Sequence, residues 1–375
     1  MINIEKKKWT LMFYFASDNV LSPSALSQVK AMKAAGFQVN TNVIVYFDPN
    51  EKGAPTRVFE INQKQKQKNT SSVIGDCSGP FVSVLTGDNL SPAEISNLPG
   101  AESKEFGKSL RNIDELDATT ALSNFLGFCA ETYPADHYML FMVGHGMVVG
   151  RDAFLPDENP ESAIGLVQLG ETIRRFSDQI KKHAGVLELI GMHSCSMSAI
   201  EVAYQLKGTA SYMLSSQGIS FVPAWPYRQM LIEVFNAVET GSAVSTTDAR
   251  VNVNLLKRLH TLCIHNSADF MYAGYSADSC LCSLDDRVRN LDKPITNLTN
   301  ALMEGVLDDH CRKLILLAHW NSQSYWHDTY TDLYDFCVCL RRLCELPKLD
   351  QQQQQQAPPF GRRRSDKPLE AIAGA

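Results

Sequence analysis

Residues 187–206, LELIGMHSCSMSAIEVAYQL, join a run of strand-forming residues to a helical pattern through a short polar junction. The run 187–192 is short and mostly apolar, which is typical of a buried strand, and apolar residues recur at helical spacing from Ile200 onward. Cys195 is therefore predicted to follow the C-terminal end of a strand and to precede a helix. Backbone N–H groups and the helix dipole favour a thiolate at such a position.

Upstream of this junction the chain alternates strands and helices in the same way. The runs 9–15 and 41–47 are predicted buried strands separated by a helical pattern. The runs 138–143 and 187–192 are separated by a second amphipathic helix, and 212–215 is the next predicted strand. Strands that alternate with crossover helices form a mostly parallel sheet. We therefore predict an α/β fold in which helices flank a mostly parallel central sheet.

The rest of the chain divides into loops, helices and a tail. A hairpin is predicted around the polar segment 62–80, which has little to bury and should be a mobile surface loop. Residues 241–345 are mainly helical in pattern and are expected to pack on the sheet, which completes one domain over 1–345. The glutamine-rich segment 346–375 cannot form a core and is predicted to be a disordered tail.

Composition argues against several classes of protein. The formal charge of −6 is spread without long basic or acidic blocks, so no nucleic-acid partner is expected. The apolar run 9–16 ends at Ser17, and no segment approaches the ~18 apolar residues of a membrane span, so we predict a cytoplasmic protein without membrane contact. The ten cysteines are predicted to be reduced, and their C-x-C pairs lack zinc-site spacing, so no metal site is expected.

His145 is the histidine best placed to act with Cys195. It follows the predicted strand 138–143 between two glycines, and the carboxyl ends of neighbouring parallel strands share one edge of a sheet. A nucleophilic thiolate needs a base nearby, and a developing oxyanion needs backbone donors, for which the N–H groups of Gly146 and Cys195 are candidates. The pattern predicts a Cys–His dyad; the alternative is a buried strand-end histidine beside an inert thiol.

Five segments carry a family resemblance: WTLMFYFASDNVL, LDATTALSNFLGFCAETYPADHYMLFMVGHG, LIGMHSCSMSAIEVAYQLKGTASYMLSSQ, AWPYRQML and SQSYWHDTYTDLYDFCVCL. In order and character, over residues 9–343, they resemble the clostripain-like cysteine peptidases of the caspase-like group, which includes legumain, gingipains and separase. The resemblance implies a caspase-like three-layer sandwich and an endopeptidase with His145 as the dyad histidine and Cys195 as the nucleophile. Its implied partners are protein or peptide substrates, and neither step through an acyl-enzyme needs an organic cofactor.

The sequence departs from the family where substrate should bind. Relatives usually carry Asp-x-Cys, which helps accept arginine or lysine at P1, but His193 occupies that aspartate position here. Residues 218–227 contain no carboxylate, so a basic P1 preference is not carried over, because burying an unpaired arginine would cost several kcal/mol. Gly144 also stands where relatives often have Asp or Asn before the histidine.

Four residues are expected to bind substrate, and three of them have a structural alternative. His193 is either a specificity residue, whose partly protonated imidazole accepts an acidic or polar P1 side chain, or a pocket-wall or core-facing residue bonded to a nearby carbonyl. Trp225 and Tyr227 match the family's cleft-forming aromatic segment or else pack in the core. Ser216, just after the strand 212–215, completes the set.

Regulation is inferred from one loop and from the family. Residues 147–165 include an expected exposed processing loop, in which Arg151 is the candidate for self-cleavage. Calcium dependence and an activating protein or protease are implied by the resemblance alone. The competing account is a catalytically weak or inactive member that keeps the fold and binds peptides in a regulatory role.

Overall fold

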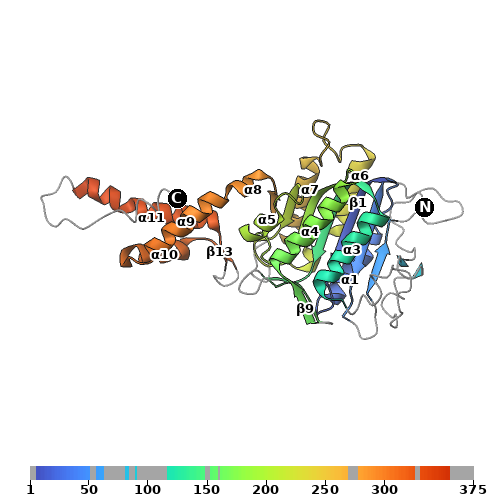
Figure 1. Ribbon diagram of the computed structural model, residues 1–375, viewed down its shortest axis with the longest axis horizontal. Helices are drawn as coiled ribbons and strands as arrows, with labels where there is room; N and C mark the ends of the chain where they lie inside the picture. The colour runs from blue at the N-terminus through green and yellow to red at the C-terminus, as the bar shows by residue number, and fades with distance from the viewer. Residues whose placement is uncertain are drawn as a thin grey trace. The chain divides into compact units, whose positions relative to one another are not determined.

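The chain separates into two compact units, Met1–Asp285 and Asp286–Ala375 (Figure 1). This boundary differs from the single domain predicted over 1–345, because the helices after Asp285 bury apolar residues against one another. The predicted loop 62–80 lies almost wholly outside the described residues. The computed structural model describes residues 6–50, 56–62, 81–83, 89–90, 116–147, 153–158, 161–268, 278–325 and 330–354.

The first unit is built on one mixed sheet. Within the described residues its strand order is β12-β11-β10-β6-β1-β2-β3-β4-β5. The pairs from β11 to β2 are parallel, whereas β12 and the strands from β3 onward pair antiparallel. The predicted parallel centre and the hairpin of β3 with β4 are thus confirmed. The strands are β1 (Lys7–Phe15), β2 (Thr41–Phe47), β3 (Arg57–Glu60), β4 (Phe81–Ser83), β5 (Asn89–Leu90), β6 (Ala135–Val143), β10 (Val186–His193), β11 (Tyr212–Ser215) and β12 (Cys280–Ser283).

Helices cover both faces of this sheet, as the sequence pattern predicts. Side chains of a strand point alternately to its two faces, so Phe13 and Tyr14 of β1 face opposite layers. Phe13 lies in a buried cluster with Val29 and Leu231, while Tyr14 contacts Phe125, with the ring centroids 5.7 Å apart. Figure 1 shows α3 and α4 lying across one face of the sheet. One layer holds α1 (Ser22–Lys33), α6 (Tyr227–Glu239) and α7 (Val253–Ala268), and the other holds α3 (Ala118–Thr132), α4 (Leu166–Lys181) and α5 (Ile200–Leu206).

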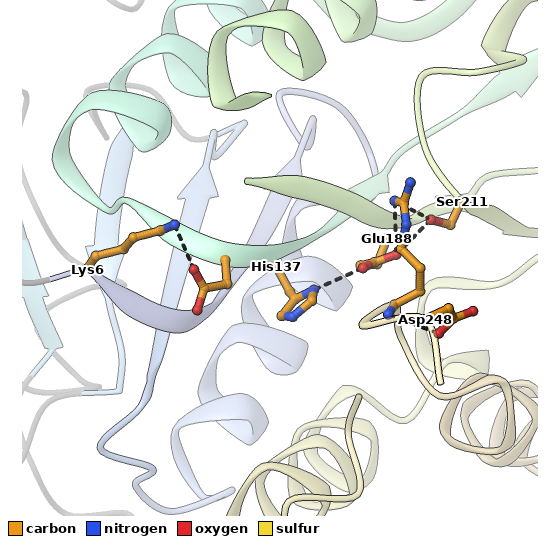
Figure 2. Close-up of polar contacts among 7 residues, drawn as sticks. Lys6, His137, Glu188, Ser211 and Asp248 are labelled. Carbon is orange, nitrogen blue, oxygen red and sulfur yellow. Dashed lines mark hydrogen bonds and ion pairs between the residues drawn. The ribbon is translucent and has the colours of Figure 1, made fainter. Parts of the chain in front are cut away.

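A buried carboxylate organises the N-terminal edge of the central strands (Figure 2). Glu188 of β10 has no exposed side-chain surface, and its two oxygens have different partners. His137 Nδ1 of β6 lies 2.9 Å from Oε1, and the Ser211 hydroxyl donates to Oε2 at 2.6 Å. Arg250 Nη1 lies 4.0 Å from the same Oε2 and brings a positive charge. Both oxygens of Glu188 are therefore satisfied, as burial of a carboxylate requires.

Glu188 is also the extra residue of a β-bulge. The register of β10 against β6 shifts between Leu187, which pairs with Tyr138, and Leu189, which pairs with Met139. In a regular strand the two leucines would share a face. The bulge instead sends Leu189 into the cluster under α6, and every later residue of β10 follows that new alternation.

The second unit contains four helices and a two-stranded hairpin within its described residues. Its small core is formed by Ala301, Cys311, Ala318, Leu340 and Cys344. The last helix continues to Gln354, beyond the start of the predicted tail at 346, because glutamine is a good helix former and extends a helix already nucleated. No helix of the described chain has the length and apolar character to span a bilayer. The elements are α8 (Asp286–Asn290), α9 (Asp292–Gly305), α10 (Asp309–Asn321), β13 (Ser324–Tyr325), β14 (Tyr330–Thr331) and α11 (Leu333–Gln354).

Candidate active site

His145 and Cys195 lie at the same edge of the sheet because their strands are neighbours. β6 and β10 are parallel, and Val143 pairs with His193 at the end of both. The Gly144 N–H continues this pairing by donating to the His193 carbonyl at 3.4 Å. Each residue of the predicted dyad therefore stands two positions beyond a paired residue, on adjacent strands.

The glycines on either side of His145 occupy positions too close to neighbouring atoms for a side chain. A Cβ on Gly146 would lie 2.8 Å from the Cys195 carbonyl oxygen and 2.8 Å from the Cβ of Ser194. A Cβ on Gly144 would lie 2.7 Å from Cδ2 of Leu155 and 3.2 Å from the Ala16 carbonyl oxygen, so the Asp or Asn of relatives would require Leu155 to shift. The Gly-His-Gly segment is thereby fixed directly against the backbone of the candidate nucleophile.

The two candidate dyad side chains are both held in neutral forms. Burial raises the pKa of the Cys195 thiol, although the backbone N–H groups of Ser220 and Cys195 itself lower it. Partial burial lowers the pKa of His145, with the Glu158 carboxylate acting in the opposite direction. Both residues are described, and no hydrogen bond joins the imidazole to the thiol. Instead the Ser220 N–H donates to Sγ at 3.4 Å, and the thiol approaches the Ser220 carbonyl at 3.8 Å.

The residues after Cys195 pair with the loop that follows β11. The Ser196 N–H donates to the Gly218 carbonyl and the Ser198 N–H to the Ser216 carbonyl, both at 2.9 Å. Ser196 reaches this pairing with a left-handed backbone, φ 57°, which is strained for a residue with a Cβ. Within the described chain the hydroxyls of Ser194 and Ser196 are buried and have no hydrogen-bond partner. Cys195 thus lies between two serines whose hydroxyls have no hydrogen-bond partner in the described chain.

Asp278 is a residue of this region that sequence reasoning missed. Its Oδ1 accepts the N–H groups of Gln217 at 2.8 Å and of Gly218 at 3.0 Å, and its Oδ2 accepts the Gly218 N–H at 2.9 Å. Its negative charge also raises the pKa of the Cys195 thiol. No motif surrounds Asp278, and its only sequence signal is its place just before the C-x-C pair Cys280 and Cys282, which lies in strand β12.

Comparison with known proteins identifies the relatives of this site. The family model described as the clostripain family matches residues 13–357, which is most of the chain. The chain belongs to the clostripain family. Clostripain from Hathewaya histolytica is 23% identical over 385 residues, which cover 89% of this chain but only 65% of that protein.

Two crystal structures share the fold of this clostripain-family chain. A secreted cysteine protease from Bacteroides thetaiotaomicron, in complex with an irreversible peptide inhibitor, matches with a TM-score of 0.52 and 16% identity, covering 93% of this chain and 83% of that one. A structure of a secreted cysteine protease from the same organism, named iotapain, matches with a TM-score of 0.53 and 14% identity, covering 96% and 87%. The predicted sandwich is thereby confirmed.

The histidine at the family's aspartate position is buried in the clostripain-family chain. Nε2 of His193 lies 2.9 Å from the Phe221 carbonyl and Nδ1 lies 2.7 Å from the Tyr227 hydroxyl. Because a carbonyl only accepts, Nε2 carries the proton and Nδ1 accepts from the tyrosine. Burial lowers the pKa of His193 to about 3, so the ring is neutral at pH 7. The geometry therefore favours the interpretation of His193 as a core-facing residue bonded to a carbonyl.

The other three residues expected to bind substrate are buried as well. Trp225 stacks on His193 with ring centroids 4.5 Å apart, and Tyr227 lies in the core cluster. Ser216 is also buried, although its carbonyl accepts the Ser198 N–H in the segment that follows Cys195. Both aromatic side chains are packed in the core cluster, which favours their core-packing interpretation.

The predicted processing loop is partly a small sheet. β7 (Gly146–Met147), β8 (Ala153–Glu158) and β9 (Glu161–Ile164) pair antiparallel, and Phe154 and Ile164 are buried. The expectation of an exposed loop over 147–165 is therefore wrong for these strands, because their apolar side chains find a buried face. Arg151 lies outside the described residues.

Proposed function

We propose that this chain is a cysteine endopeptidase in which Cys195 is the nucleophile and His145 the general base. The observation that carries the proposal is the contact between the Gly-His-Gly segment and the Cys195 backbone, where only glycine fits at 146. His145, the Cys195 thiol and the N–H groups of Gly146 and Cys195 lie at one sheet edge, and this closeness supports the roles proposed for them. Membership of the clostripain family supports the same chemistry.

The proposed reaction has two steps. His145 takes the Sγ proton as the sulfur attacks the scissile carbonyl, and the resulting oxyanion accepts N–H bonds from Gly146 and Cys195. Collapse of the tetrahedral intermediate breaks the C–N bond, and the imidazolium returns its proton to the leaving amine. His145 then takes a proton from water as the water oxygen attacks the thioester carbon. The C–S bond breaks, and the imidazolium returns this proton to the Cys195 sulfur.

Several finer features stay predictions. We expect protein or peptide substrates, limited proteolysis in the cytoplasm and self-cleavage after Arg151 if the enzyme prefers arginine. An activating protein or protease and calcium dependence rest on the family resemblance. In the described part of the chain, no group of three or more His, Cys, Asp or Glu residues is arranged to hold a metal ion. Because His193 is buried and neutral, it does not offer a charged imidazole to the P1 side chain of a substrate. We therefore propose that other groups set the P1 preference.

A P1-scanning fluorogenic peptide assay on the full chain tests the proposal, with and without calcium. Cys195→Ala and His145→Ala should each lower kcat/KM by roughly a thousandfold or more. Cys337→Ala, which removes a partly buried thiol of the second unit, should leave turnover unchanged. Because burial lowers the pKa of His145, the acid limb of kcat/KM should lie below its ordinary pKa of 6.5. Turnover that survives Cys195→Ala would reject the proposed nucleophile, and wild-type chain that binds peptides without cleaving them would support the inactive regulatory account.

A further inference from the structure

The loop of residues 216–220 is fastened to the rest of the site at both of its ends. Three hydrogen bonds from the N–H groups of Gln217 and Gly218 end on the carboxylate of Asp278. These two donors come from consecutive peptides, so one side chain with two acceptor oxygens fixes the orientation of both. Asp278 precedes β12, whose Cys280 pairs with Ser215 at the end of β11, so the clamp is anchored to the sheet itself.

The far end of the same loop contacts the candidate nucleophile. The Ser220 N–H donates to Cys195 Sγ at 3.4 Å, and the Cys195 thiol donates to the Ser220 carbonyl at 3.8 Å. Between the two ends, the Gly218 carbonyl accepts the Ser196 N–H at 2.9 Å. Asp278, Gly218 and Ser220 therefore form a continuous connection from the edge of the sheet to the thiol.

We propose that Asp278 is a positioning residue that holds loop 216–220 so that the Ser220 peptide covers the Cys195 thiol in the resting state. A carboxylate makes all three contacts, whereas an asparagine that kept its oxygen on the two donors would turn its N–H₂ toward the Gly218 N–H and lose the third. The same charge, close to the thiol, disfavours the thiolate. Substrate that displaces the Ser220 peptide would free Sγ for transfer of its proton to His145, so this last step rests on the proposed function.

The rate of alkylation of Cys195 by iodoacetamide tests the clamp without requiring catalysis. The modified peptide is quantified by mass spectrometry across a range of pH in the full chain. We expect Asp278→Asn to alkylate roughly fivefold faster or more at pH 7.5, and the pH midpoint to move down, because the loop loosens and a negative charge near the thiol is lost. Asp278→Glu keeps the charge and should alkylate at an intermediate rate.

Asp285→Asn is the matched control, because Asp285 lies just beyond the opposite end of β12 and accepts the Ser283 hydroxyl at 2.8 Å. It should leave the rate and the midpoint at wild-type values. A folded Asp278→Asn that matches the wild type in both would overturn the proposal. If Asp278→Asn does not fold, an unchanged midpoint and rate in Asp278→Glu would do so. Faster alkylation in a chain without peptidase activity would keep the clamp and reject the proposed function, whereas active enzyme with unchanged alkylation would do the reverse.

Discussion

The two ends of strand β10 differ in how completely the polar side chains around them are hydrogen-bonded. At the N-terminal end, Glu188 is fully buried and both of its oxygens have partners (Figure 2). At the C-terminal end, Ser194 and Ser196 have buried hydroxyls without partners in the described chain, and the thiol between them is hydrogen-bonded to the Ser220 peptide of a loop. The buried polar side chain at the N-terminal end is therefore fully hydrogen-bonded, whereas the C-terminal end keeps two buried hydroxyls that are free to bond.

The largest effect on stability should come from Glu188, both of whose oxygens are hydrogen-bonded in the core. Glu188→Ala should lower the free energy of unfolding by about 3–5 kcal/mol, because it removes the buried acceptor of Ser211 and the partner of His137. Urea unfolding at pH 7 measures this. Asp136→Ala is the control, since the Asp136–Lys6 pair is half-exposed and should contribute at most about 1 kcal/mol. Equal losses in the two variants would break the comparison between buried and exposed pairs.

A smaller effect on stability should come from His193, which ends β10 and packs against Trp225 in the core. Its pKa falls from an ordinary value of 6.5 to about 3 on burial, so between those pH values the unfolded chain binds a proton that the folded chain does not. Stability must then rise with pH across that window and stop changing above it. Between pH 5 and pH 7 the contribution is about 2 kcal/mol.

Urea unfolding of His193→Gln at pH 5 and pH 7 isolates this contribution. The glutamine Nε2 can donate to the Phe221 carbonyl but does not titrate, so the difference in stability between the two pH values should shrink by that amount. The same difference in variant and wild type would show that the imidazole is not kept neutral by folding.

The smallest effect should come from backbone strain at either end of β10. Ala184 and Ser196, which flank the strand, both have left-handed backbones with φ of 56° and 57°. Ala184→Gly should raise the free energy of unfolding by about 0.5 kcal/mol, and Ser196→Gly by about 1 kcal/mol, because the second also removes a buried unpartnered hydroxyl. Thermal unfolding and the peptide assay together measure this pair. Only Ser196→Gly should lower turnover, and equal turnover in both variants would mean that strain beside Cys195 has no role in catalysis.

Sequence patterns were sufficient for features that depend on local periodicity. The buried runs that form β1, β2, β6 and β10 are visible because strands buried on both faces are continuously apolar. The shared edge of His145 and Cys195 followed from strand order alone, since both residues directly follow predicted strands. The Gly-His-Gly segment could be identified because glycine indicates close backbone approach.

Features that depend on long-range contacts were not predictable. Asp278 clamps Gln217 across 61 residues, and no periodicity connects a single aspartate to a distant loop. The burial of His193 depends on Phe221 and Tyr227, which the sequence places nearby without revealing which way their groups point. The separate second unit was missed because helices that pack on a sheet and helices that pack on each other show the same amphipathic pattern.

The bulge at Glu188 determines which face of the sheet each later residue of β10 points to. Its extra residue exchanges the two faces once, so that Gly191 points at Phe141 and His193 at Trp225, where a glycine and a flat ring fit. A regular strand through the same residues, without the bulge, would invert that order and aim Ile190 and Met192 at the space now shaped for the glycine and the imidazole. The bulge at one end of β10 therefore determines which residues face the core at the other end, two positions before Cys195.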